Sequence, residues 1–279
     1  MTTCLVSVLA ACAQTGDPGT SDATTSTASP APTSTLPPVV DCPGAGEFEE
    51  GGGIADLDGS GSDSARLGRV SWETSDRCET FNFDFETSEG APATTTPDIR
   101  VDHLESFQVI RISFDVESSV VIDQIVETEL VERLYVVRAL DGGMFVDLHL
   151  AAPAAARATA LTSPARLSVE LRPGFVPIEG SPTHSDDVVM VSPTADAEIA
   201  PSTELTGYAR TSEASVLIVV TQAGTLVTET SATTADPTGA WGEFRIELTL
   251  PPGDVSVFAG ERSAGDGSLD GLTIDVSVS

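Results

Sequence analysis

The chain has 279 residues and a formal net charge of −30, from 43 acidic and 13 basic side chains, all 13 of them arginine. Binding to nucleic acid requires a basic stripe that releases counterions from phosphates, so this charge argues against nucleic acid as a partner and disfavours anionic lipid surfaces. The length suits one large or two ordinary domains, and 40% apolar residues indicates that part of the chain lies outside any core.

The first predicted element is an export signal. Residues 4–11 read CLVSVLAA, an apolar run too short to span a bilayer as a helix. The stretch LAAC that ends at Cys12 resembles the lipobox of bacterial lipoprotein signal peptides, which implies lipid attachment at Cys12 and cleavage just before it. We therefore expect residues 1–12 to be a lipoprotein signal peptide, the alternative being an apolar tail with a chance cysteine. Since no Lys or Arg precedes the apolar run, we expect the natural start to lie upstream of Met1.

A tether is predicted next. Of the 29 residues from 13 to 41, 18 are Thr, Ser, Pro or Gly, and none is aromatic or basic. Such a segment cannot bury enough apolar area to offset the entropy of ordering it. We expect a disordered Thr/Ser/Pro-rich linker over residues 13–46, with a root-mean-square span of about 30 Å, that lifts the rest of the chain off a membrane.

The two cysteines beyond the signal, Cys42 and Cys78, are predicted to form a disulfide, because an even pair in an exported protein is typically oxidised. Closing this loop stabilises the fold by about 3 to 4 kcal/mol in the chain-entropy model. A metal site is disfavoured, since the chain has no CxxC motif and only three histidines.

Beyond the linker the sequence alternates between apolar and polar residues, as half-buried strands do. In residues 77–86, RCETFNFDFE, the three phenylalanines Phe81, Phe83 and Phe85 share one face. No segment carries a 3.6-residue stripe, including residues 151–160, which are apolar on all sides and broken by Pro153. We therefore expect an all-β chain with at most a turn or two of helix. The same alternation predicts further strands at 108–116, 134–139, 145–150, 166–172, 188–191, 204–209, 215–221, 224–230, 243–250, 255–258 and 272–278.

These strands fall into two sets, which indicates two domains. A Pro-rich linker over residues 174–186 separates a β-domain over 47–173 from a second domain over 187–279. The second set has seven short strands at nearly regular spacing, which is typical of an immunoglobulin-like sandwich. The predicted architecture is two β-sandwiches after a disordered tether.

A family resemblance adds to this pattern. In residues 187–279, the segments MVSPTADAEIAPSTELTGYAR, GAWGEFRIELTL and ERSAGDGS resemble the Gmad2 immunoglobulin-like domain of bacterial envelope and spore-germination-associated proteins. In the middle region, RCETFNFDFE, VVRALDGGMFVDLHLAAPAAAR and SPARLSVELRPG are similar to AMIN-like domains of actinobacterial lipoproteins. AMIN domains dock envelope enzymes and secretion components to the cell wall, so the resemblance implies binding to peptidoglycan or to a neighbouring wall protein. Neither kind of domain is catalytic by itself.

One pair of residues could perform acid–base chemistry. Asp147 and His149 lie two positions apart on a predicted strand and share a face, and a carboxylate beside an imidazole is how a general base is oriented. However, no Gly-x-Ser-x-Gly elbow supplies a nucleophile. The interpretation we favour is a polar strand face turned to solvent, with His103 and His184 as isolated surface histidines. We therefore assign no catalytic residue, no cofactor and no enzymatic activity.

A weak calcium candidate occurs earlier. The run DLDGSG that starts at Asp56 matches positions 1, 3, 5 and 6 of an EF-hand loop, which would make Asp56, Asp58 and Ser60 oxygen ligands. Asp63 could add another oxygen. Position 12, where a bidentate carboxylate is needed, is Leu67, so an ordinary Asp/Gly/Ser loop is the favoured interpretation.

The aromatic residues admit two interpretations. Glycan-binding proteins display aromatic platforms on which sugars stack, and this chain has four Trp and Tyr residues, Trp72, Tyr135, Tyr208 and Trp241. Trp241 stands at the head of an alternating strand, where packing in a core explains it at least as well as a sugar platform.

The sequence thus predicts a non-catalytic, lipid-anchored protein on the extracytoplasmic face of the cell membrane. Its expected partner is the cell wall or an envelope protein, with the membrane contacted only through the anchor. One alternative is an accessory or regulatory subunit that presents a partner envelope hydrolase. A weaker alternative is an extracellular protein that binds calcium or another small ligand.

Overall fold

The computed structural model describes residues 42, 46–75, 77–177, 180–211 and 213–279. The predicted lipid-attachment residue Cys12 lies outside this part of the chain. The described residues are all-β, as predicted, and their one helical element is a single 3₁₀ turn, η1 (Glu105–Phe107). No helix among them is long and apolar enough to cross a membrane.

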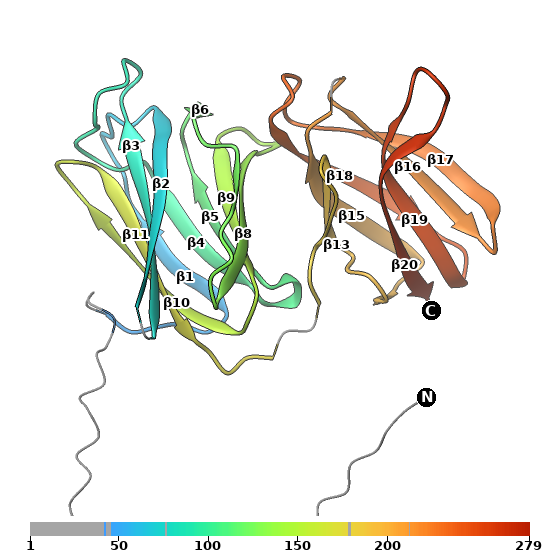
Figure 1. Ribbon diagram of the computed structural model, residues 1–279, viewed down its shortest axis with the longest axis horizontal. Helices are drawn as coiled ribbons and strands as arrows, with labels where there is room; N and C mark the ends of the chain where they lie inside the picture. The colour runs from blue at the N-terminus through green and yellow to red at the C-terminus, as the bar shows by residue number, and fades with distance from the viewer. Residues whose placement is uncertain (1–41, 43–45, 76, 178–179, 212) are drawn as a thin grey trace, which may run out of the picture. The chain divides into compact units, whose positions relative to one another are not determined.

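The first half of the described chain forms two sheets, which together we call the N-terminal sandwich. Its strands are β1 (Gly52–Leu57), β2 (Arg66–Ser75), β3 (Cys78–Glu86), β4 (Ile99–Leu104), β5 (Val109–Phe114), β6 (Ser118–Ser119), β7 (Asp123–Ile125), β8 (Val131–Arg138), β9 (Met144–Leu150), β10 (Ala154–Leu161) and β11 (Arg166–Pro173). One sheet has the order β10-β11-β3-β2-β6, and the other runs β1-β4-β5-β9-β8 with β7 also paired to β8. Figure 1 shows these strands as two layers.

The core of the N-terminal sandwich confirms the predicted alternation. Phe81, Phe83 and Phe85 on β3 are at most 1% exposed, and they pack with apolar side chains from both sheets. Strand β9 differs, because all seven of its residues are buried. One of its faces must therefore meet something other than this core.

The sequence pattern did not predict strands β1, β2, β4 and β10, nor the short strands β6 and β7. In β2 the pairing with β3 shifts between Leu67 and Arg69, so a bulge at Gly68 interrupts the alternation. In β10 the first four residues are all buried, since Ala154 and Ala156 face the core and Phe48 covers Arg157 on the other side. A strand covered on both faces shows no period of two.

The second half forms the C-terminal sandwich. Its strands are β12 (Thr183–His184), β13 (Val188–Ser192), β14 (Glu198–Ile199), β15 (Ser202–Ala209), β16 (Ser215–Gln222), β17 (Thr225–Thr233), β18 (Trp241–Thr249), β19 (Gly253–Arg262) and β20 (Leu269–Val278). Strands β18, β15, β13 and β12 pair in that order, and they face a sheet of order β14-β20-β19-β16-β17 across a shared core. The seven predicted strands are all present, and β12 lies in the segment that the sequence assigns to a linker.

The two sandwiches share one sheet within the compact unit formed by residues 40–279. Strands β8 and β18 pair in parallel over two residue pairs, Val137 with Trp241 and Arg138 with Gly242. A separate hydrophobic cluster, which we call the junction, forms beside this pairing. It consists of Tyr135, Val137, Phe145, Val189, Val191, Tyr208 and Trp241.

Candidate functional site

The predicted disulfide is present and fastens the base of the linker to β3. Cys42 and Cys78 are bonded to each other, 36 residues apart in sequence. The guanidinium of Arg157 on β10 donates hydrogen bonds to the carbonyl oxygens of Cys42 (3.1 Å) and Gly46 (2.9 Å). The ring of Phe48 lies under this guanidinium, 4.4 Å from it, which adds a cation–π contact. The point where the linker enters the fold is therefore held at several positions.

Asp147 on β9 is fully buried and forms an ion pair with Arg111 on β5. The guanidinium donates two hydrogen bonds to the carboxylate, from Nε at 2.8 Å and from Nη2 at 2.7 Å. Arg111 also lies over the ring of Phe145, 4.0 Å from its centre. Burial disfavours the charged guanidinium, but the charge of Asp147 outweighs it and the pKa of Arg111 is raised. Both oxygens of this carboxylate are thus engaged by the protein itself.

His149 lies next to this pair and forms a hydrogen bond between its Nε2 and the hydroxyl of Tyr208 on β15. Burial, and then the positive charges of His184 and Arg111, lower the pKa of His149 to about 3. The ring is therefore neutral, and with its proton on Nδ1 it accepts the hydrogen bond from Tyr208. Burial also raises the pKa of Tyr208, so its hydroxyl keeps its proton.

The interpretation of Asp147 and His149 as a solvent-facing polar strand face is wrong. Asp147 is 0% and His149 5% exposed, because the junction covers this face of β9. Sequence reasoning also missed Arg111 and Tyr208, which complete the polar network. The sequence feature that could have indicated this network is Arg111, a charged residue on an alternating strand that could pair with Asp147.

The junction also takes up three of the four Trp and Tyr residues. Tyr135, Tyr208 and Trp241 are each at most 1% exposed, and their ring centres lie 5.1 to 5.8 Å apart. Trp72 is half-buried and stacks on Phe81, with ring centres 6.3 Å apart. The packing interpretation of Trp241 is confirmed, and the three junction rings present no platform to a sugar.

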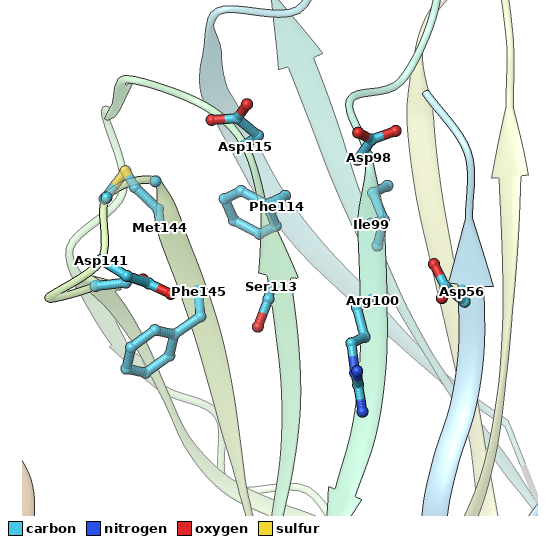
Figure 2. A pocket seen from close by; sticks show the side chains of 13 residues that line it. Asp56, Asp98, Ile99, Arg100, Ser113, Phe114, Asp115, Asp141, Met144 and Phe145 are labelled. Atoms are coloured by element: carbon cyan, nitrogen blue, oxygen red, sulfur yellow. The ribbon is translucent and has the colours of Figure 1, made fainter. Parts of the chain in front are cut away.

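A hollow of about 410 Å³ opens in the N-terminal sandwich, and Figure 2 shows it from close by. Its floor comes from β4, β5 and β9, and its rim includes the turn Asp141-Gly142-Gly143, where both glycines have a positive φ. Asp98 and Asp115 stand at one end of the hollow, and the guanidinium of Arg100 is directed away from them. The full lining is Asp56, Asp98, Ile99, Arg100, Ser113, Phe114, Asp115, Ala139, Asp141, Gly142, Gly143, Met144 and Phe145.

The chemistry of the hollow is acidic. Four carboxylates line it, and the single guanidinium, that of Arg100, is already paired with Asp102 through two hydrogen bonds of 2.7 and 3.0 Å. Asp98 accepts a hydrogen bond of 2.6 Å from the backbone N–H of Gly59. This lining can accept hydrogen bonds and attract cationic groups, and it repels phosphates and carboxylates.

The residues of the calcium candidate have different surroundings and do not face one common site. Asp56 lines the hollow, whereas Asp58 accepts hydrogen bonds from the hydroxyl and N–H of Ser60, which lower its pKa. Asp63 accepts from the backbone N–H groups and hydroxyls of Thr95 and Thr94, and its pKa is lowered to about 2. Within the described part of the chain, no group of three His, Cys, Asp or Glu side chains could hold a metal ion. Calcium binding therefore stays the weaker alternative for these residues.

The comparisons with known families support the interpretation of the second half. Residues 187–268 match the Gmad2 family, the immunoglobulin-like domain of bacterial spore germination. The Gmad2 match covers strands β13 to β19 and contains both Tyr208 and Trp241 of the junction. The Gmad2 match thus falls within the C-terminal sandwich, and the residues it covers supply one side of the junction.

The other comparisons show less. No curated protein matches the chain in sequence. Among solved structures, the chain is similar to a polysaccharide lyase at 10% sequence identity and a TM-score of 0.20, over 75% of this chain and 33% of the lyase. The chain therefore spans about a third of the length of that enzyme.

Proposed function

We propose that the chain is a non-catalytic, lipid-anchored protein of the cell envelope that binds peptidoglycan or scaffolds other envelope proteins. In this proposal Cys12 carries the lipid, residues 13–46 form the tether, and the N-terminal sandwich is an AMIN-like module that contacts the wall. The Gmad2 domain follows it as a second binding module. The family description of that domain, which refers to spore germination, is consistent with an envelope role.

The observation that carries the proposal is the way the base of the tether is fastened. A disulfide persists in oxidising compartments outside the cytoplasm, so the Cys42–Cys78 bond supports export. The hydrogen bonds from Arg157 to the linker backbone fix the end of the tether on the N-terminal sandwich. With its base fastened, the tether limits how far the folded module can move from its anchor.

The junction network supports the non-catalytic part of the proposal. A general base needs a titratable group within reach of a substrate. Here Asp147 is occupied by Arg111, and His149 is buried and hydrogen-bonded to Tyr208. The hydrogen bond between His149 and Tyr208 joins the two sandwiches, and neither Asp147 nor His149 is free to meet a substrate.

Two experiments test this proposal. Labelling with radioactive palmitate should mark the membrane-associated chain, and Cys12→Ser should abolish the label and release the chain from the membrane. Label retained by Cys12→Ser would contradict the anchor. Incubation of purified chain with sacculi should release no soluble muropeptides, and release of them would contradict a non-catalytic role.

The accessory-subunit alternative makes a different prediction. If the chain presents a partner hydrolase, the hydrolase should cleave sacculi faster in its presence, and the chain alone should not be retained on bare wall. The same purified chain can be used to distinguish wall binding from stimulation of a partner hydrolase.

A further inference from the structure

Strand β17 forms an open margin of the C-terminal sandwich. Its nine residues, Thr225–Thr233, pair with β16, and no other strand pairs with it among the described residues. Figure 1 shows β17, in orange, as the outermost strand of its sheet. In an antiparallel strand of this length, about four residues direct both N–H and C=O groups away from the partner strand. These groups form a template on which a further strand can pair.

The other margins of the sheets are shorter than β17 or partly covered. The two-residue strands β6, β12 and β14 end three of them. At the margin formed by β10, Glu49 and Ala156 exchange two backbone hydrogen bonds of 2.9 Å. The margin formed by β1 is shorter than β17 and carries a bulge between Gly53 and Ala55. In the described part of the chain, β17 is therefore the longest strand at the margin of a sheet.

The sequence of β17 lacks the usual protection of an edge strand. It contains no proline, lysine or arginine, and its single charge, on Glu229, is paired with Arg262 at 2.9 Å. The one protective feature of β17, a bulge at Val227, is confined to the hairpin end, and from Thr228 onward the pairing with β16 is regular. Threonine and valine favour strands, and Leu226 is 57% exposed at the start of this margin. Natural edge strands that must stay unpaired typically carry lysine, proline or inward-pointing charges.

We propose that β17 binds an extended, basic strand of a partner envelope protein, which adds to the sheet by β-augmentation. Main-chain hydrogen bonds to β17 supply the affinity, as in other strand-addition complexes. Charge selects the partner: the chain carries a net charge of −30, so a basic strand is attracted and a second copy of this chain is repelled. The inference rests on the scaffolding part of the proposed function and assigns it to a surface of the Gmad2 domain.

The test uses the full chain with Cys12→Ser and three synthetic peptides. The first alternates Thr and Val between terminal lysines, the second replaces the lysines with glutamates, and the third replaces every second Val with Pro. Hydrogen–deuterium exchange should show amide protection confined to β17 on saturation with the lysine peptide. The glutamate peptide should bind at least about tenfold more weakly because of the acidic surface, and the proline peptide should not bind.

A charge placed on the inner side of an edge strand prevents strand addition. Thr230→Lys should therefore weaken binding of the lysine peptide by at least about tenfold, because Thr230 pairs with the core residue Ile218 and is only half-buried. The matched control is Thr159→Lys on β10, an exposed position whose binding should equal that of the parent. If the melting temperature of Thr230→Lys falls below that of the parent, Thr228→Lys is used in its place.

Three results would overturn the inference: protection outside β17, equal binding of the proline peptide, or unchanged binding by both β17 variants. A doubled mass in analytical ultracentrifugation, with β17 protected before any peptide is added, would also overturn it in favour of a second copy. Retention on sacculi should be unchanged by Thr230→Lys. If the parent chain is not retained on sacculi, wall binding is contradicted, whereas the result for strand addition still stands.

Discussion

Acidification is expected to destabilise the fold through His149, which the junction buries. Burial, and then the charges of His184 and Arg111, lower the pKa of His149 from 6.5 to about 3. The folded ring therefore stays neutral while the unfolded ring takes up a proton as the pH falls through about 6.5. Between these two values the unfolded state binds more protons, so the free energy of unfolding must decrease as the pH decreases.

The magnitude follows from the same linkage. One additional proton on the unfolded chain lowers the free energy of unfolding by about 1.4 kcal/mol per pH unit. From about pH 6.5 to about pH 5 we expect a loss of about 1.6 kcal/mol, in a window where most ordinary carboxylates are still ionised. Urea titrations at a series of pH values can measure it by fluorescence, because Trp241 is buried in the junction and becomes exposed on unfolding.

Two variants identify the cause. His149→Gln keeps an oxygen that can accept the hydrogen bond from Tyr208 but cannot take up a proton, so the slope over this pH window should be lost. His184→Gln is the comparison variant and should keep most of the slope, since burial, the largest cause of the lowered pKa of His149, is unchanged. If His149→Gln retains the full slope, the assignment of this pH dependence to the buried ring is refuted.

Three further predictions concern stability. Tyr208→Phe leaves the Nε2 atom of the buried histidine without its partner and should cost about 1 to 3 kcal/mol; Tyr135→Phe in the same cluster should cost less, and equal costs would contradict this account of the hydrogen bond. Asp147→Asn leaves a guanidinium that is only 22% exposed without its counter-charge, so urea titration should show a loss of about 3 to 5 kcal/mol, and a loss below that of Tyr135→Phe would speak against it. Cys42→Ser should cost about 3 to 4 kcal/mol and make unfolding insensitive to dithiothreitol, whereas a continued response to the reductant would show that another thiol pair is responsible.

The fold class could be predicted because period-two alternation reports one buried face. Phe81, Phe83 and Phe85 illustrate this, since each second residue of β3 enters the core. The strands that escaped prediction depart from that rule for local reasons. Gly68 inserts a bulge into β2, and β10 is covered on both faces, so its alanines show no alternation.

The junction could not be predicted, because alternation marks which residues share a face but not what covers that face. Asp147 and His149 share a face, as the sequence indicated, but the partners that bury them come from distant strands. Tyr208 lies 59 residues from His149 in sequence, and no local pattern links the two. Polar residues on a covered face are then indistinguishable from polar residues in water until the second sandwich is placed against them.

The most direct test of the account is co-sedimentation of the unlipidated chain from Cys42 onward with purified peptidoglycan sacculi at low and high salt. We predict retention in the pellet that is no weaker at high salt, because a chain of net charge −30 gains nothing from ionic attraction to an anionic wall and loses repulsion when salt screens it. A chain that stays in the supernatant at both salt concentrations would contradict wall binding and leave a protein partner as its target.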